Sequence, residues 1–410
     1  MTDAILSADE QSVVFKTLNT KELEDYSYSI PPAAPILGTS FENLRPDYNV
    51  SANPVGEEVI FTIRNAQMVR NMALRSDLTL ASETAGDESG NPVGLKIAAE
   101  IQIKAQNRLI MKQSAEYIQA RVQASKPSAC AHFYAMSYPV DPTTGVIIDT
   151  SATTSYSCTT PIFCSWFEDV SAAYDASFYE TISVHIFINT KAAIGNTIDY
   201  SASSFRLWVW SWTPNTEYHN FLKSKNSSPE KPLNMLMYNT TTERTTLTSL
   251  TENEFRINNK HPTFNSYFMV KKKDSTALIA SNQTARIDSF DVSLGGTQLL
   301  RSVPRHIGDH DVSVNGLNSG IFAPTPTTLA KFPWKISRVP WCLEPDEKIQ
   351  NTGGISFANV NVPMITVYTT ASAEGVDTTA SLYEFVQVHE YWNFVTFSNR
   401  SGSVAVSVSV

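Results

Sequence analysis

The sequence predicts an all-β protein, an antiparallel β-sandwich with long loops and at most one or two short helices. Short runs of β-branched and aromatic residues recur along most of the chain, and polar segments rich in Gly, Pro, Asn and Ser separate them. Only 17% of the residues are charged and 42% are hydrophobic, which suits sheet surfaces that become covered in an assembly. The sequence shows no internal repeat, which disfavours propellers and solenoids.

The chain has 410 residues, enough for two cores of ordinary size. We expect an N-terminal arm over residues 1–55, because this stretch contains a proline-rich break and a polar turn before the first clear strand. Residues 213–232 are polar and contain three prolines, so we interpret them as a linker. The linker would separate a first sandwich over residues 56–212 from a second over residues 233–410.

Four segments before the linker have the composition of strands. They are Glu58–Ile63, Ala73–Leu80, Ser183–Asn189 and Phe205–Trp212. The last segment is apolar on both sides, because Trp208, Trp210 and Trp212 lie on one side and Phe205, Leu207 and Val209 on the other. We expect the tryptophans to be buried in a sandwich or in a contact between subunits; stacking on sugars or bases is the alternative.

Five segments after the linker also have the pattern of strands. They are Ile287–Leu294, Lys335–Arg338, Pro363–Thr369, Tyr383–Phe397 and Ser403–Val410. The last of these alternates valine with small residues and carries no charge. We expect it to be paired inside a sheet, because a free uncharged edge would aggregate.

The best helix candidate is Lys104–Ala124, since its Ala, Gln, Lys, Arg, Met and Glu residues all favour helices. The only compact basic run, Lys271–Lys273, is interpreted as a solvated turn. The formal net charge is −9 and the N-terminal stretch is acidic, so the chain has no basic arm. We therefore expect no strong direct binding to nucleic acid, since that affinity comes mainly from Lys and Arg on phosphates.

No stretch of about 18 apolar residues occurs, and the N-terminal residues lack the pattern of a signal peptide. We expect no transmembrane segment and no secretion by a signal peptide. Four cysteines occur without a C-x-x-C pair, which favours free thiols over a zinc or redox site.

Two groups of residues invite a chemical role, and neither fits one well. His306 and His310 would share a face only in a helix, which Gly308 disfavours, and Asp309 with Asp311 supplies too few ligands to define a calcium site. We interpret this segment as an exposed loop. His389 and Glu390 are neighbours in an expected strand, so their side chains should point to opposite faces. We expect no catalytic, cofactor-binding or metal-binding residues, and no cofactor.

The segments Val339–Glu347 and Asn351–Val360, followed by strands at Met364–Tyr368 and Phe385–Phe397, resemble the last third of viral major capsid proteins with two jelly rolls. In that family a strand and a Leu-x-Pro turn lead to a Gly turn and an Asn-Phe-Ser-type strand. The resemblance covers residues 335–410.

The resemblance implies a jelly-roll β-sandwich protein with two jelly rolls in one chain, which self-assembles into trimeric capsomers of an icosahedral virus shell around the genome. It also implies that the chain resides in the virion capsid, which is assembled inside the host cell. Its partners there would be further copies of the same chain and other capsid proteins. The helix candidate has no counterpart in that family. A single jelly-roll capsid protein with residues 213–315 as a projecting insertion stays open, as do a carbohydrate-binding β-sandwich and a hydrolase on a β-sandwich.

Overall fold

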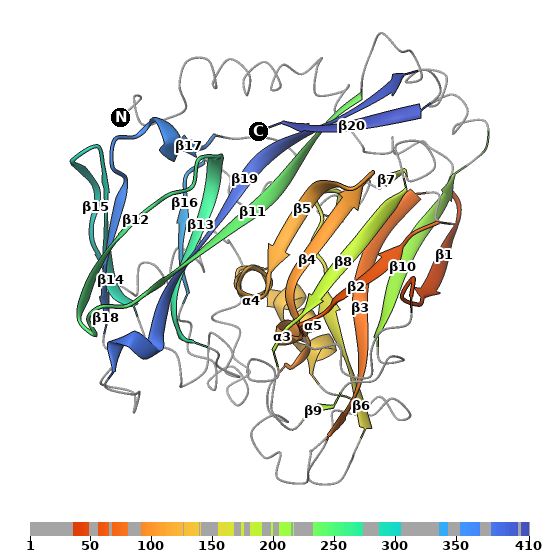
Figure 1. Cartoon of the computed structure of the whole chain (residues 1–410), viewed down its shortest axis with the longest axis horizontal. Helices are drawn as coiled ribbons and strands as arrows, with labels where there is room; N and C mark the ends of the chain where they lie inside the picture. The colour runs from red at the N-terminus through yellow and green to blue at the C-terminus, as the bar shows by residue number, and fades with distance from the viewer. Residues whose placement is uncertain are drawn as a thin grey trace.

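The structure of the protein is a computed structural model. It describes residues 36–48, 56–64, 68–80, 92–125, 127–138, 140, 155–167, 174–175, 181–190, 198–199, 205–214, 216, 233–273, 287–304, 336–342, 353–369, 379–400 and 403–409. In these residues the chain forms two β-sandwiches, each of two antiparallel sheets (Figure 1). The prediction of an all-β protein is confirmed.

The first sandwich is formed by the described residues from Ile36 to Pro214. Its first sheet has the order β1-β10-β3-β6, with β7 and β9 pairing with β3, and its second sheet has the order β2-β8-β4-β5. The strands are β1 (Ile36–Leu44), β2 (Glu58–Thr62), β3 (Met68–Leu80), β4 (Ala98–Ala105), β5 (Arg108–Ser114), β6 (Ser155–Pro161), β7 (Tyr174–Asp175), β8 (Ile182–Ile188), β9 (Ile198–Asp199) and β10 (Phe205–Pro214). The helices are α3 (Gly94–Ile97), α4 (Ala115–Gln123) and α5 (Pro127–Ser137).

The second sandwich begins at Leu233. Its first sheet has the order β11-β19-β13-β16, with β17 pairing with β13 and β20 with β19, and its second sheet has the order β12-β18-β14-β15. The strands are β11 (Leu233–Thr246), β12 (Glu252–Arg256), β13 (Pro262–Lys272), β14 (Ile287–Leu294), β15 (Thr297–Pro304), β16 (Ile336–Pro340), β17 (Ile355–Ser356), β18 (Met364–Thr369), β19 (Tyr383–Arg400) and β20 (Ser403–Ser409).

Both sandwiches have the strand order of a jelly roll. When the additional strands β7, β9, β17 and β20 are set aside, each has eight strands, of which the first, last, third and sixth form one sheet. The second, seventh, fourth and fifth form the other. This is the eight-stranded pattern of two interlocked Greek keys. The alternative of one jelly roll with an insertion over residues 213–315 is therefore wrong, because β11 to β14 of that range belong to the sheets of a second sandwich.

Two differences from the expected elements have local causes. The N-terminal arm predicted over residues 1–55 includes β1, which pairs along its length with β10 and so belongs to the first jelly roll. The helix predicted over Lys104–Ala124 is present only in α4. Its first part forms the β4–β5 hairpin, whose turn residues Gln106 and Asn107 both have positive φ. A two-residue turn of this kind pairs its flanking strands, and the packing of Ile110 and Met111 in the core overrides the helix propensity of this part of the predicted segment.

The C-terminal strand is paired inside a sheet, as predicted. β20 runs antiparallel to the end of β19, with Val404 opposite Asn399 and Val408 opposite Val395. Its strand partner satisfies backbone groups that would otherwise form an open edge.

Removal of residues 403–410 should therefore leave the end of β19 without this partner. We expect most of the truncated protein to be found in the insoluble fraction, because an unpaired uncharged edge associates with other edges. The measurement is the soluble fraction after expression, with Ser407→Thr as the control that keeps the strand. A truncated protein that stays soluble and assembles would contradict the expectation.

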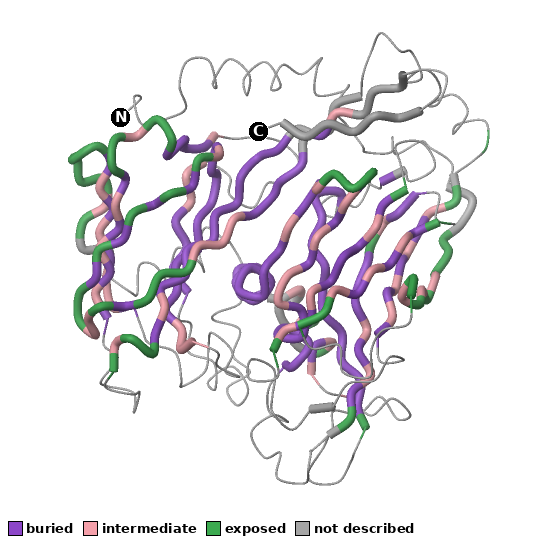
Figure 2. Tube along the Cα trace, in the orientation of Figure 1, coloured by how far each residue is buried: buried purple, intermediate pink, exposed green. Residues whose placement is uncertain are grey.

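The central strands of the first sheet of the second roll, β13 and most of β19, are buried on both faces, whereas the end of β11 from Arg244 to Thr246 is exposed (Figure 2). Phe268, Val270 and Phe385 pack inside the second roll with residues of β14 and β18. Tyr267 and Val388, on the opposite face of the same strands, join the core cluster of the first roll. One face of this sheet thus packs inside the second roll and the other face packs on the first roll, so that the sheet joins the two rolls (Figure 1).

Candidate assembly surfaces

Backbone and side-chain hydrogen bonds join β5 of the first roll to β11 of the second. Asn239 Oδ1 accepts from the Lys112 backbone N–H at 2.7 Å, and Thr240 Oγ1 donates to the Lys112 carbonyl at 2.6 Å. The hydroxyls of Ser114 and Thr242 lie 2.8 Å apart. These bonds fix the register of one roll on the other, because each partner belongs to a regular strand or to its end.

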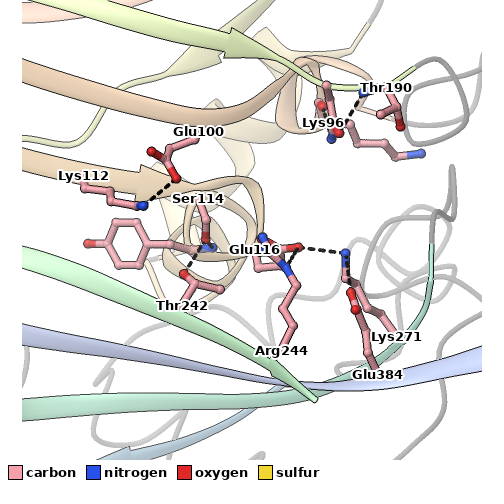
Figure 3. Close-up of polar contacts among 12 residues, drawn as sticks. Lys96, Glu100, Lys112, Ser114, Glu116, Thr190, Thr242, Arg244, Lys271 and Glu384 are labelled. Atoms are coloured by element: carbon pink, nitrogen blue, oxygen red, sulfur yellow. Dashed lines mark hydrogen bonds and ion pairs between the residues drawn. The ribbon is translucent and has the colours of Figure 1, made fainter. Parts of the chain in front are cut away.

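A charged cluster lies beside the contact between β5 and β11, at the start of α4 (Figure 3). The side chain of Ser114 caps the helix by accepting from the Tyr117 backbone N–H, which places Glu116 in the first turn. Glu116 accepts from Arg244 Nη2 at 2.8 Å and from Lys271 Nζ at 2.7 Å, and Lys271 also lies 3.2 Å from Glu384. The carboxylate of Glu116 thus joins the first roll to two strands of the second.

The surroundings of Glu116 hold its carboxylate in the charged form. Burial raises the pKa of Glu116, but the positive charges of Lys271 and Arg244 outweigh burial and lower the pKa to about 2. Burial likewise lowers the pKa of Lys271, while Glu116 and Glu384 raise it above its ordinary value by more. The interpretation of Lys271 as part of a solvated turn is wrong, since its side chain is only 23% exposed and lies in this cluster.

A second polar group is buried deeper in the same interface, around Glu390 of β19. The Glu390 carboxylate accepts from the Tyr117 hydroxyl at 2.7 Å and from Asn265 Nδ2 at 2.8 Å. Asn265 Oδ1 in turn accepts from Arg338 Nε at 3.1 Å, and the Arg338 guanidinium lies 6.0 Å from the centroid of the Tyr267 ring. Both Glu390 and Arg338 are fully buried, so this network is structural rather than accessible to a substrate.

His389 and Glu390 point to opposite faces of β19, as predicted from strand geometry. Glu390 faces the first roll, whereas His389 faces the interior of the second roll, between the rings of Phe268 and Phe357. His389 Nδ1 lies 2.7 Å from the Ser266 hydroxyl, which also accepts from Trp341 Nε1 at 2.8 Å. The two neighbours cannot act on one substrate atom.

Burial lowers the pKa of His389 to about 3, so the ring is neutral at physiological pH. His306, Gly308, Asp309, His310 and Asp311 lie outside the described residues. Within the described part of the chain, no group of three or more His, Cys, Asp or Glu side chains gathers around one point. No described helix is long and apolar enough to cross a membrane.

The tryptophans of β10 lie on the outer face of the first roll. Phe205, Leu207 and Val209 fill the core, and Trp208, Trp210 and Trp212 on the other side of the strand are only partly buried. The tryptophan side is therefore not buried inside the sandwich, and its burial in a contact between subunits stays a prediction. Among the described residues, no other element packs on the outer side of β10, which carries the three tryptophans.

Sequence reasoning did not identify the residues that join the two rolls. Glu116 carries a local signal, because Ser114 and Glu116 have the spacing of a helix start. Arg244 and Lys271 carry none, since they contact Glu116 from more than 120 residues away in the sequence.

The fold and its two joined jelly rolls can be compared with solved structures. The chain is similar to PBCV-1 VP54, with a TM-score of 0.66 and 13% identity over 94% of this chain and 100% of that one. It is similar to the Faustovirus major capsid protein, with a TM-score of 0.62 and 10% identity over 95% of this chain and 99% of that one. The structure of Sulfolobus Turreted Icosahedral Virus matches with a TM-score of 0.54 and 8% identity over 86% and 90% of the two chains.

No protein-family profile matches the sequence, and no curated protein matches it. The fold therefore defines the class: the chain is a double jelly-roll protein. More particularly, its fold is the one found in the major capsid proteins of icosahedral viruses, and the similarity extends over nearly the whole of each chain. The double jelly-roll fold that the sequence resemblance implied is confirmed.

Proposed function

We propose that the chain is a structural major capsid protein that self-assembles into capsomers of an icosahedral virus shell around the genome. The observation that carries this proposal is the double jelly roll, which matches capsid proteins along nearly its whole length. The chain would act by burying its sheet faces against neighbouring copies, without a catalytic residue. Its place would be the virion capsid, beside further copies and other capsid proteins.

The contact between the two rolls supports a ring-shaped capsomer. Within the chain, the outer face of the first sheet of roll two packs on β5 and α4 of roll one. Two sheets lie at opposite ends of the longest axis of the molecule: the first sheet of roll one and the second sheet of roll two (Figure 1). Among the described residues, no other sheet packs on their outer faces. Repeating the same contact between copies would join these ends head to tail, and such a contact closes into a ring when the rotation between successive copies completes a full turn.

Three copies supply six rolls, which gives the ring a hexagonal outline that tiles a surface. The capsomer is accordingly a homotrimer. The test is size-exclusion chromatography with light scattering, followed by negative-stain microscopy. A particle with three times the 45.3 kDa mass of the chain and a hexagonal outline supports the proposal. A monomer that stays stable at micromolar concentration, with no shells or capsomers on the grid, overturns it.

The charge of the chain predicts weak binding to nucleic acid. The net charge is −9, so the chain as a whole repels phosphates rather than neutralising them. We expect a Kd above roughly 10⁻⁶ M for non-specific DNA or RNA at physiological salt. A filter-binding titration measures it, and nanomolar affinity would contradict the expectation.

A further inference from the structure

The outer face of the second sheet of roll one carries a serine, a histidine and a glutamate side by side. Ser183 and His185 lie two residues apart on β8, so their side chains point to the same side of the strand. Val184 and Ile186, which alternate with them, fill the core of the roll. Glu58 lies diagonally across from His185 on β2, and β8 lies between β2 and β4 (Figure 1).

The imidazole of His185 joins the other two side chains. Its Nδ1 lies 2.6 Å from Glu58 Oε1, and its Nε2 lies 2.9 Å from the hydroxyl of Ser183. A carboxylate can only accept a hydrogen bond, so Nδ1 donates its proton to Glu58. In the neutral ring, Nε2 is then left to accept the hydroxyl proton of Ser183. Hydroxyl, imidazole and carboxylate are thus linked in the order of a catalytic triad, in which the ring takes the proton of the attacking oxygen.

A lysine places a positive charge beside these three residues. Lys104 of β4 lies directly opposite Ser183 in the strand register, and its Nζ is 3.9 Å from Glu58 Oε1. The ammonium therefore lies beside the imidazole of His185, because both contact the same carboxylate oxygen. When a hydroxyl attacks an ester, negative charge develops on the carbonyl oxygen, and a fixed positive charge nearby stabilises it.

The three residues lie where a small molecule can reach them. Ser183 is half-buried, and the side chains of Glu58 and Lys104 are 34% and 22% exposed. The side chain of His185 is only 10% exposed, so its ring is held in place beneath the hydroxyl and the carboxylate. Because the face of a sheet contacts an acyl group from one side only, this site suits small esters and selects little among them.

A second pair of serine and histidine in the same chain shows what the first pair has in addition. Ser266 Oγ lies 2.7 Å from His389 Nδ1, but both residues are fully buried in roll two. The Ser266 hydroxyl also accepts from Trp341 Nε1, and His389 Nε2 has no hydrogen-bond partner among the described residues. The buried pair thus lacks both the carboxylate and the exposure that Ser183 and His185 have.

We propose that Ser183, His185 and Glu58 form a triad that cleaves small carboxylic esters. Ser183 is the nucleophile, His185 is the general base and then the general acid, and Glu58 positions the ring. This activity goes beyond the capsid function, in which assembly itself needs no chemistry, and it departs from the expectation of no catalytic residues. No local pattern in the sequence could indicate it, because Glu58 and His185 lie 127 positions apart.

The reaction moves one proton through His185 in each of two steps. In the first step, the oxygen of Ser183 bonds to the carbonyl carbon of the ester while its proton passes to Nε2. The bond from that carbon to the alcohol oxygen then breaks, and the proton passes from Nε2 to the alcohol. In the second step, water attacks the acyl-serine in the same way, which releases the carboxylic acid and restores the hydroxyl. Water is the only co-reactant.

The test is covalent labelling of the full chain with a fluorophosphonate, which bonds through phosphorus to the oxygen of an activated serine and loses fluoride. Mass spectrometry of the peptides should find the label on Ser183 and not on Ser266. Ser183→Ala should remove the label. His185→Gln should slow the labelling roughly 100-fold or more, because it removes the base and keeps a hydrogen-bonding group. Hydrolysis of p-nitrophenyl acetate should fall in the same order.

Glu58→Gln tests the positioning role separately. Its amide can donate to Nδ1, which fixes the ring proton on Nε2, so the plateau of the labelling rate at high pH should fall. The matched control is His261→Gln, at a partly buried histidine that stacks on Tyr391, and it should label at the unaltered rate. Unchanged urea midpoints confirm that the variants are folded. An unlabelled Ser183, or equal rates for the unaltered protein and His185→Gln, overturns the triad, as does an unchanged plateau in Glu58→Gln.

Discussion

Replacing Glu116 by alanine should destabilise the joined rolls by about 3 kcal/mol. The side chain of Glu116 is only 5% exposed, and its carboxylate is the shared partner of Lys271 and Arg244. Its removal leaves Lys271, which is largely buried, with Glu384 alone. Breaking a buried ion pair on one side costs more than the pair contributes, because the remaining charge stays desolvated. Urea unfolding at pH 7, followed by tryptophan fluorescence, measures the change.

A nearby surface pair provides the matched control. Glu100 and Lys112 lie 2.7 Å apart in the neighbouring strands β4 and β5, with side chains that are 25% and 37% exposed (Figure 3). Water screens this pair, so Glu100→Ala should cost no more than about 0.5 kcal/mol. Equal losses for the two variants would show that the cluster around Glu116 does not hold the rolls together.

The stability that Glu116 provides should also depend on pH at the acid end. Its pKa is about 2 in the folded chain and near 4.5 when unfolded, so the unfolded chain takes up the proton first as the pH falls. The contribution is complete above pH 4.5 and is lost as the pH falls towards 2. The difference between the unaltered protein and Glu116→Ala should therefore shrink only below about pH 4.

The strands were predictable from the sequence because their signals are local. Alternation over Ile287–Leu294 and the glycines that follow it define β14 and its turn to β15, where Gly295 and Gly296 both have positive φ. The C-terminal segment was placed correctly in a sheet for the same reason, since its period of two leaves one consistent pairing.

The predictions that were wrong concern features that depend on tertiary packing. Most residues from Lys104 to Gln113 favour helices individually, and the burial of Ile110 and Met111 in the sandwich core selects strands. Likewise, no local pattern reveals that Lys271 meets Glu116, because strand and helix come together only when the second roll docks on the first. The partial exposure of Trp210 was not predictable either, since alternation shows two apolar faces but not which of them faces the core.

The interior of the second roll should weaken in mild acid because of His389. Its side chain is fully buried between Phe268 and Phe357, and burial lowers its pKa to about 3. In the unfolded chain the same histidine titrates near pH 6.5, so between pH 6.5 and pH 3 the unfolded chain binds a proton that the folded chain does not. Stability therefore falls as the pH drops through this window.

From pH 7.5 to pH 5.0 the loss attributable to His389 should be about 2 kcal/mol per chain, since each pH unit below 6.5 contributes about 1.4 kcal/mol. His389→Gln should remove this dependence, because glutamine can still hydrogen-bond to Ser266 but carries no titrating group. The measurement is the urea midpoint of both proteins at the two pH values.

A second histidine separates this effect from acid sensitivity in general. His261 is only partly buried, stacked on Tyr391 with ring centroids 4.1 Å apart, and burial lowers its pKa as well. Because His261 stays in contact with water, His261→Gln should leave most of the pH dependence in place. If His389→Gln loses as much stability between pH 7.5 and pH 5.0 as the unaltered protein, the buried ring is not the acid-sensitive element. Removal of the dependence by His389→Gln alone would locate the acid sensitivity in the core of the second roll.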